Sequence, residues 1–180
     1  IATWDKLFIY TTALADNNLT KIKNYIGIQP DFYGDELILN GDFTIDSNGD
    51  GLADNWQVLV SGNLGSVNHT IINNAQKLIL TEDLGTVYIS LQQLNIGTIG
   101  ETYKVSFYYK SNKVLSNRIL LSYGNRINLQ ASEIFSYYEA NIVASQTYGA
   151  IILYSPDIND YFEIKNISVK KIYQNYYKAD

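Results

Sequence analysis

Hydrophobic and polar residues alternate with a period of two along most of the chain after residue 35. In the segment 101–110, Val105 and Phe107 fall on one side while Tyr108 and Lys110 fall on the other. Successive side chains of a strand point to opposite faces, so this pattern predicts a strand with one buried face. Similar segments, separated by glycine and by Asn, Asp or Ser clusters, predict strands at 36–44, 56–60, 66–72, 77–80, 86–94, 101–110, 114–123, 133–143, 147–154 and 160–173.

This run of short strands predicts an all-β fold, a β-sandwich of the jelly-roll kind. The N-terminal part differs, because residues 1–30 contain one strand-like segment followed by the apolar spacing of a short helix. One strand and one helix cannot form a core, so residues 1–30 are expected to end an upstream domain or to be an appendage. We expect a linker at 31–35 and the β-domain at 36–175.

Composition supports a folded β-domain. Hydrophobic residues make up 46% of the 180 residues and charged residues 17%, which suits a chain with a packed core. The formal net charge of −5 disfavours nucleic acid as a partner. Cysteine is absent, which excludes disulfides and thiolate chemistry within this sequence.

No apolar run approaches the ~20 residues of a membrane span, so we expect none. No basic segment precedes a short apolar run, so we expect no signal peptide. The sequence also contains no methionine, even at position 1, and it is expected to be an excerpt of a longer polypeptide.

A candidate metal site lies between the first predicted strand and Trp56. Oxygen-bearing side chains alternate at Asp46, Asn48 and Asp50, and Asp54 follows after two glycines. Alternating Asp and Asn with glycine is how a tight loop directs several oxygens at one Ca²⁺ ion. The alternative is a solvated turn of Asx residues and glycine without metal.

Three motifs resemble the carbohydrate-binding modules of families 4 and 9. They are Leu37–Phe43 followed by Trp56, Gly100–Lys110, and Tyr161–Val169, in that order along the chain. The resemblance covers about 36–173. It implies a jelly-roll β-sandwich with Trp56 in the core, appended to a secreted or surface protein. It also implies a structural calcium and glycan binding on a concave face or at the loop edge.

One position departs from that family. Lys165 stands where the family usually has an Asp that helps to hold the structural calcium. A lysine ammonium there could replace the cation, which leaves the 46–54 loop as the best metal site. This loop resembles calcium loops of bacterial surface proteins, and that resemblance implies the Leu52 carbonyl as a further ligand. We therefore expect a structural Ca²⁺ that stiffens the loop.

A shorter motif concerns the N-terminal part. The segment 5–14, followed by Leu19 and Ile22, resembles the last strand and short helix of laminin-G or concanavalin-like lectin domains. It implies a lectin-like domain just upstream in the full protein.

Catalysis is not expected. His69 is the only histidine and lies on a predicted strand, where it is more often a surface or cross-strand residue than a base. The sequence has no nucleophile elbow, zinc-binding helix motif or phosphate-binding glycine loop. Glu82 and Asp83 are neighbours in a turn and cannot face each other across a substrate.

Glycan binding needs flat aromatic rings for sugar faces and nearby polar groups for hydroxyls. Residues that alternate outward from the predicted strands could supply both on one concave sheet face. They are Tyr88, Gln92, Tyr108, Lys110, Arg118 and Tyr137, with Tyr138 as the alternative to Tyr137 and with Glu139 as a further polar neighbour. An exposed tyrosine-rich surface is equally consistent with a protein–protein interface.

Two functions follow. The first is a non-catalytic carbohydrate-binding or adhesion module, in the extracellular space or at a cell surface, whose partner is a polysaccharide or cell-surface glycan. The alternative is a structural, assembly or receptor-binding domain of a phage particle or surface layer, whose partners are other subunits. An exposed groove around Tyr88, Gln92 and Tyr108 favours the first, and burial of these side chains favours the second.

Overall fold

The computed structural model describes residues 32–62, 66–116, 121 and 128–173, and within them Tyr33–Ile172 form one compact unit. Its elements are strands, and no helix occurs in these ranges. They are β1 (Phe32–Glu36), β2 (Gln57–Gly62), β3 (Ser66–Ile72), β4 (Ala75–Glu82), β5 (Thr86–Gln93), β6 (Thr102–Ser111), β7 (Leu115–Ser116), β8 (Asn128–Leu129), β9 (Ser132–Val143), β10 (Gly149–Tyr154) and β11 (Tyr161–Tyr173).

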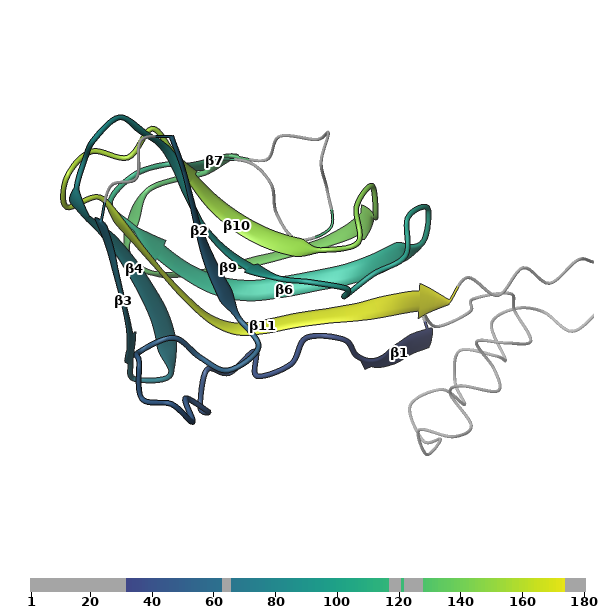
Figure 1. The fold of residues 1–180 in the computed structure, drawn as a ribbon. Coiled ribbons are helices and arrows are strands. Elements are labelled where there is room, and N and C mark those ends of the chain that lie inside the picture. The colour runs from purple at the N-terminus through teal and green to yellow at the C-terminus, as the bar shows by residue number, and fades with distance from the viewer. Residues whose placement is uncertain (1–31, 63–65, 117–120, 122–127, 174–180) are drawn as a thin grey trace, which may run out of the picture. The chain divides into compact units, whose positions relative to one another are not determined.

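The strands form two main sheets (Figure 1). The six-stranded sheet has the order β3-β4-β11-β6-β9, with β1 added against β11, and the three-stranded sheet has the order β10-β5-β2. Phe107 and Phe162 of the larger sheet share one core with Ile89 and Leu91 of the smaller. The described residues therefore form an all-β jelly-roll β-sandwich, which confirms the predicted fold class.

The start of the domain differs from the prediction. Residues 32–35, assigned to a linker, lie in β1, and the strand predicted at 36–44 stops at Glu36. The Glu36 carboxylate accepts the backbone N–H groups of Leu37 and Ile38, at 3.1 and 3.2 Å. The Leu37 N–H also donates to the Val169 carbonyl of β11 at 3.0 Å, directly after the end of β1. Asn40 and Phe43 then have φ values of 52° and 54°, which end extended backbone.

The segment 37–56 crosses one end of the sandwich without joining a sheet, and Asn40 organises its course. The Asn40 amide donates to the carbonyls of Ile45 (2.7 Å) and Asp54 (3.2 Å), and its Oδ1 accepts the Thr44 N–H. The Asn40 carbonyl accepts the indole N–H of Trp56 at 3.1 Å. One side chain thus closes the loop on itself.

Two glutamines attach this segment to both sheets. Gln76 of β4 accepts the Ala53 N–H at 2.9 Å and donates to the Gly51 carbonyl at 2.9 Å. Gln93 of β5 makes the equivalent pair of bonds to the N–H and carbonyl of Leu39, both at 2.9 Å. Both glutamines are buried, so their amides satisfy backbone groups that no strand pairs.

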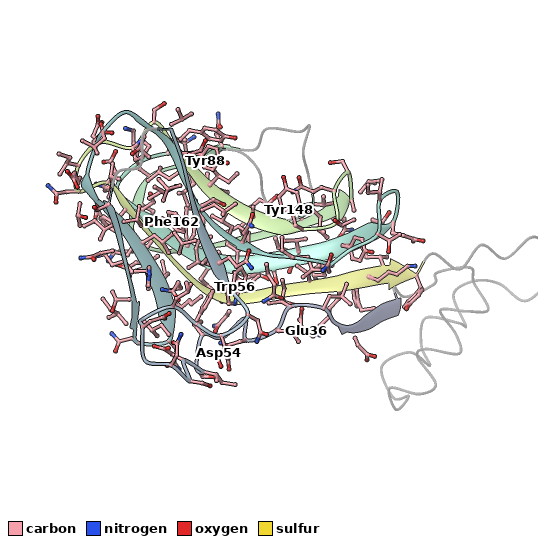
Figure 2. All side chains as sticks on the ribbon, in the orientation of Figure 1. Glu36, Asp54, Trp56, Tyr88, Tyr148 and Phe162 are labelled. Carbon is pink, nitrogen blue, oxygen red and sulfur yellow. The ribbon has the colours of Figure 1, made fainter. Side chains whose placement is uncertain are left out.

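The aromatic residues of the segment enter the core. Phe43 is fully buried and Trp56 is 4% exposed, and their ring centroids lie 5.2 Å apart. Figure 2 shows Trp56 and Phe162 inside the sandwich. Trp56 is therefore a core residue, as the sequence predicts.

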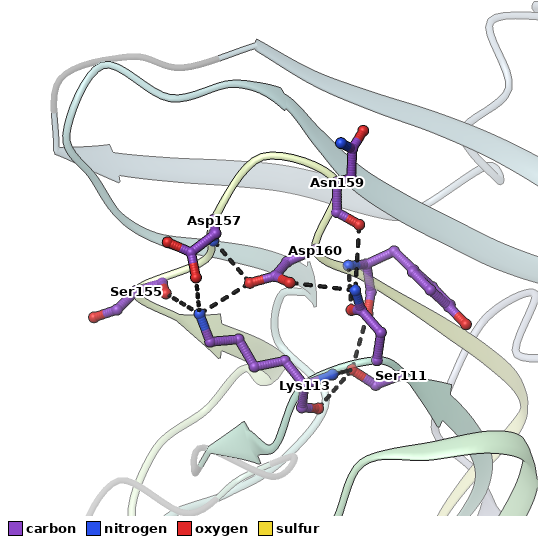
Figure 3. A network of polar contacts seen from close by, with 8 residues as sticks. Ser111, Lys113, Ser155, Asp157, Asn159 and Asp160 are labelled. Atoms are coloured by element: carbon purple, nitrogen blue, oxygen red, sulfur yellow. Dashed lines mark hydrogen bonds and ion pairs between the residues drawn. The ribbon is translucent and has the colours of Figure 1, made fainter.

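A polar network fixes the turn between β10 and β11 (Figure 3). The Lys113 ammonium contacts carboxylate oxygens of Asp157 and Asp160, both at 2.9 Å, and donates to the Ser155 carbonyl at 2.6 Å. These partners, led by the Asp157 carboxylate, raise the pKa of Lys113 above its usual value. The network holds the turn that leads into Tyr161, the first residue of β11.

The expected strand and helix at 1–30 lie outside the described residues. So does most of the strand expected at 114–123, of which Leu115–Ser116 form β7. Among the described residues, the structure has no helix with the length and apolarity needed to cross a membrane.

Gln76→Ala is expected to lower the free energy of unfolding by about 2–3 kcal/mol, because it leaves the buried Ala53 N–H without a partner. Gln76→Glu is expected to destabilise as well, because it sets a carboxylate against the Gly51 and Thr70 carbonyl oxygens that Gln76 now donates to. Urea unfolding measures both, with Gln130→Ala at an exposed glutamine as the control. Equal stability of the Gln76→Ala and control variants would contradict this role.

Candidate functional site

The outward face of the six-stranded sheet carries a cluster of aromatic side chains. Tyr108 of β6 and Tyr137 of β9 are register partners, with ring centroids 5.0 Å apart and exposures of 37% and 53%. Their strand neighbour Phe107 points the other way and is fully buried. We call the outward aromatic residues the aromatic face; they are Tyr33, Tyr108, Phe135, Tyr137 and Tyr161.

Lysines lie over most of these rings. Lys165 Nζ is 4.0 Å from the centroid of Phe135 and 5.8 Å from that of Tyr108. Lys77 and Lys110 approach the Tyr161 ring at 4.6 and 5.5 Å. Cation–ring contacts of this length are attractive, so each lysine keeps its charge at the edge of an apolar surface.

A hollow of about 260 Å³ opens on this face. Two small side chains, Ser106 of β6 and Ser168 of β11, lie at register partners beside the bulkier residues. We call this hollow the serine pocket; its lining is Tyr33, Lys104, Ser106, Tyr137, Glu139, Ser168 and Lys170. It combines two aromatic rings with hydroxyl, ammonium and carboxylate groups.

A hydrogen-bonded group at the edge of the pocket orders Tyr137. Glu139 accepts the Tyr137 hydroxyl at 2.6 Å and pairs with the Lys104 ammonium at 3.0 Å. The Tyr137 bond, followed by the Lys104 bond, lowers the pKa of the Glu139 carboxyl, and the Glu139 bond raises the pKa of Lys104. At neutral pH the pair is therefore ionised and holds the ring in one orientation.

A β-bulge in β11 creates the pocket. The register against β6 shifts between Lys165 and Ser168, and Asn166 adopts a φ of 53° within the shift. Within the bulge Ile167 is buried, and beyond it Ser168 and Lys170 point outward into the pocket lining.

Neighbouring segments hold the bulge in place. Gly41 lies so close to β11 that a Cβ at this position would overlap the Ile167 carbonyl oxygen. The Gly41 carbonyl accepts the Ile167 N–H at 2.9 Å. Glu36 accepts the Val169 N–H at 2.7 Å and the Ser168 hydroxyl at 2.6 Å. The N–H groups of Ile167 and Val169 at the bulge are thus satisfied.

The structure brings together Tyr108, Lys110 and Tyr137 of the predicted glycan site, on this one face. It does not add Tyr88 or Gln92, which lie on β5 of the smaller sheet, so the prediction of a single face for all six residues is wrong. The side chain of Gln92 is also only 8% exposed. Arg118 lies outside the described residues.

Sequence reasoning missed several residues of the site, because strand order and register are not visible in one sequence. Tyr161 and Lys165 join the face through the pairing of β11 with β4 and β6. One signal was present: the apolar positions Phe162, Ile164 and Ile167 break the period of two at the bulge. The missed residues are Tyr33, Lys104, Ser106, Phe135, Tyr161, Lys165, Ser168 and Lys170.

Tyr88 belongs to a smaller aromatic pair on the opposite sheet. Its ring meets that of Tyr154 edge to face, with centroids 5.7 Å apart. In Figure 2 Tyr88 lies well away from Glu36, which contacts Ser168 of the serine pocket. Tyr88 therefore provides a tyrosine outside the aromatic face, against which substitutions on that face can be compared.

The predicted calcium loop is held by its own hydrogen bonds. The Asp46 carboxylate accepts the N–H groups of Gly49 and Gly51 at 2.9 and 3.0 Å. Asp50 accepts the Leu52 N–H at 2.8 Å, which lowers the pKa of its carboxyl. Gly49 and Gly51 have φ values of 70° and 84°, so glycine suits these turns.

Asp54 points into the same loop. It accepts the Ser47 hydroxyl at 2.6 Å and the Ser47 N–H at 2.9 Å, and both bonds lower the pKa of its carboxyl. Within the described ranges, no three carboxylate or imidazole side chains converge as metal ligands. Calcium at this loop, with Asn48 and the Leu52 carbonyl among its ligands, stays a prediction.

Lys165 and His69, which the sequence analysis singled out, lie in different environments. Lys165 lies over Phe135 on the aromatic face rather than beside an acidic cluster. His69 of β3 pairs in register with the buried Leu78, and its Nδ1 is buried without a hydrogen bond. His69 thus lies in a row that faces the core rather than on the aromatic face.

Comparison with solved structures supports the fold. One similar structure is a family 4 carbohydrate-binding module, with 14% identity and a TM-score of 0.51, aligned over 74% of this chain and 99% of that chain. Another is the enzymatically active domain of bacteriophage CBA120 tailspike protein 4, with 18% identity and a TM-score of 0.52, over 76% of this chain and 21% of that chain. At these identities the likeness shows the jelly-roll fold alone.

A family 29 carbohydrate-binding module is also similar, with 14% identity over 78% of this chain and 89% of that chain, at a TM-score of 0.48. No protein-family model matches the sequence. No curated protein sequence matches it either.

Tyr161 gives a pH-dependent test of the aromatic face. Burial, together with the hydrogen bond to Glu133, raises the pKa of Tyr161 from 10.0 to about 12. The folded state therefore holds this proton more tightly than the unfolded state, and the resulting stability is full below pH 10 and is lost as the pH rises toward 12. We expect the free energy of unfolding of Tyr161→Phe to fall less steeply than that of the wild type over this range. Parallel slopes would contradict the assignment.

Calcium at the 46–54 loop is tested by thermal unfolding. The prediction is that EDTA lowers the melting temperature and that Asp50→Ala removes this sensitivity, because an ion bound only to the folded state stabilises it. Identical wild-type melting curves in EDTA and in excess calcium would contradict a bound calcium ion. The loop would then be held by its own hydrogen bonds alone.

Proposed function

We propose that this chain is a non-catalytic carbohydrate-binding module that attaches a larger extracellular or surface protein to a polysaccharide. The observation that carries the proposal is the aromatic face, with Tyr108 and Tyr137 exposed side by side next to the serine pocket. Flat rings accept the apolar faces of sugar rings, and the surrounding charged and hydroxyl groups suit sugar hydroxyls.

The rigidity of the face also supports binding. The Tyr137 hydroxyl is fixed by Glu139, and the Lys110 ammonium lies 3.2 Å from Glu163, a buried carboxylate that also pairs with Lys77. Side chains ordered before the ligand arrives lose less conformational entropy on binding. The family 4 module named above has the same fold, and its name supports the proposed class of ligand.

A non-catalytic role agrees with the environment of the carboxylates. Glu163 lies between two lysines, 3.2 and 3.7 Å from their ammonium groups, and Glu139 is held by Lys104 and Tyr137. A general acid needs a raised pKa, whereas the pKa of Glu139 is lowered. Both carboxylates are thus already engaged by lysines, and neither is arranged as a general acid.

Tyr108→Ala and Tyr137→Ala are each expected to weaken polysaccharide binding about tenfold, or ~1.4 kcal/mol, because each removes a stacking ring from the centre of the face. Affinity electrophoresis against a panel of polysaccharides, followed by calorimetry with the polymers that bind, measures the effect. Tyr88→Ala, at the tyrosine pair of the opposite sheet, is the matched control.

Loss of binding in Tyr88→Ala but not in Tyr137→Ala would move the site to the smaller sheet. No binding by the wild-type chain to any polysaccharide would overturn the proposed function.

The second candidate is an assembly domain of a phage particle or surface layer, and the likeness to the tailspike domain favours it. The edge strand β9 exposes apolar side chains, with Ile134 at 77% and Val143 at 62%. Light scattering coupled to size exclusion separates the candidates. A stable oligomer that binds no polysaccharide supports assembly, and a monomer that binds one supports the module.

A further inference from the structure

We propose that the serine pocket and the adjoining aromatic face bind a polysaccharide that contains uronic acid residues, with sugar carboxylates at Lys170 and Lys165. This inference rests on the proposed function and adds the chemical class of the ligand. Its basis is the charge pairing of the lysines on this face.

Three of these lysines have carboxylate partners. Lys77 and Lys110 approach the same oxygen of Glu163, and Lys104 pairs with Glu139 at 3.0 Å.

Lys165 and Lys170 differ. Neither has a carboxylate within ion-pair distance in the part of the chain that the structure describes. Lys170 lines the serine pocket, and Lys165 rests on the Phe135 ring. Among the described residues, the face therefore offers two lysines without an ion pair, on a chain whose formal net charge is −5.

The nearby carboxylates do not neutralise these two lysines. Glu139 is committed to Lys104 and Tyr137. Glu36, beneath Ser168, accepts the Ser168 hydroxyl together with backbone N–H groups, including that of Val169. Neither carboxylate forms an ion pair with Lys170 in the described part of the chain, so the ammonium of Lys170 is available to a ligand anion.

The spacing of the two lysines favours an extended chain over a single sugar. Lys165 and Lys170 pair in register with Tyr108 and Lys104 of β6. Those partners are four residues apart, which is about 13 Å of strand. Ser168 and Ser106 lie between them. A ligand that reaches both lysines must run along β11 past the serine pocket and the Tyr137 ring.

A carboxylate fits better than a phosphate monoester. A monoester carries nearly two negative charges and three strong acceptors, which needs several donors at one point. Each lysine here supplies one ammonium as a single point charge. One carboxylate for each lysine balances the charge.

The experiment uses polygalacturonate, alginate, hyaluronate and glucuronoxylan, each beside its carboxyl-reduced form, which keeps the backbone and removes the charge. Dextran sulfate is the comparison polyanion. The variants are Lys170→Gln and Lys165→Gln, with Lys171→Gln as the control. Lys171 is next to Lys170, so its substitution changes the net charge equally, but it pairs with Glu101 and does not line the serine pocket.

We expect at least one uronic acid polymer to bind at least tenfold more tightly than its reduced form. Lys170→Gln is expected to weaken that binding at least fivefold and Lys171→Gln less than twofold, and added salt should weaken it further. Equal losses of affinity in Lys170→Gln and Lys171→Gln would show that net charge alone causes the effect and would overturn the inference. Tighter binding of dextran sulfate than of the uronic acid polymer would overturn it in the same way.

The proposed function fails separately from this inference. Binding of neutral polymers that Tyr137→Ala reduces and Lys170→Gln leaves unchanged would keep the module and overturn the uronic acid. Absence of binding to every polymer would overturn both. Thermal melting of each variant excludes unfolding as the cause, because a folded variant keeps the wild-type melting temperature within a few degrees.

Discussion

Buried backbone groups that no strand can pair set the main constraint on this fold. The segment 37–56 closes one end of the sandwich, and its N–H and carbonyl groups must find partners there. Asn40, Gln76 and Gln93 supply them with side-chain amides, each of which acts as donor and acceptor at once. Because Gln76 comes from one sheet and Gln93 from the other, the segment ties the two sheets together.

The candidate site depends on that same segment. Gly41 accepts the N–H of Ile167, and Glu36 accepts that of Val169, so together they hold the β11 bulge. The bulge reverses which residues of β11 face outward and sets Ser168 beside Ser106. Two small residues in register leave a hollow between larger side chains. The shape of this candidate surface therefore follows from how the end of the sandwich is closed.

The 46–54 loop illustrates the limit of a motif. Its alternating Asp and Asn residues are the side chains that calcium loops use, and they are also those that form tight turns by accepting backbone N–H groups. In the structure Asp46, Asp50 and Asp54 accept such bonds from Gly49, Gly51, Leu52 and Ser47. A list of residue types cannot separate these two uses, because both need oxygens directed toward the inside of the loop.

The sequence by itself determined most of the strands after residue 56 and the buried face of the segment 101–110, because alternation is a local property that a strand carries within a few residues. That reason explains why Val105 and Phe107 were expected to face inward and Tyr108 and Lys110 outward. The burial of Trp56 was instead implied by the resemblance to carbohydrate-binding modules. Only the tertiary structure decided which outward residues meet. Tyr88 and Tyr108 alternate alike in sequence, yet they lie on different sheets, because strand order depends on pairings between distant segments. The same long-range register brought Lys165 and Tyr161 to the aromatic face.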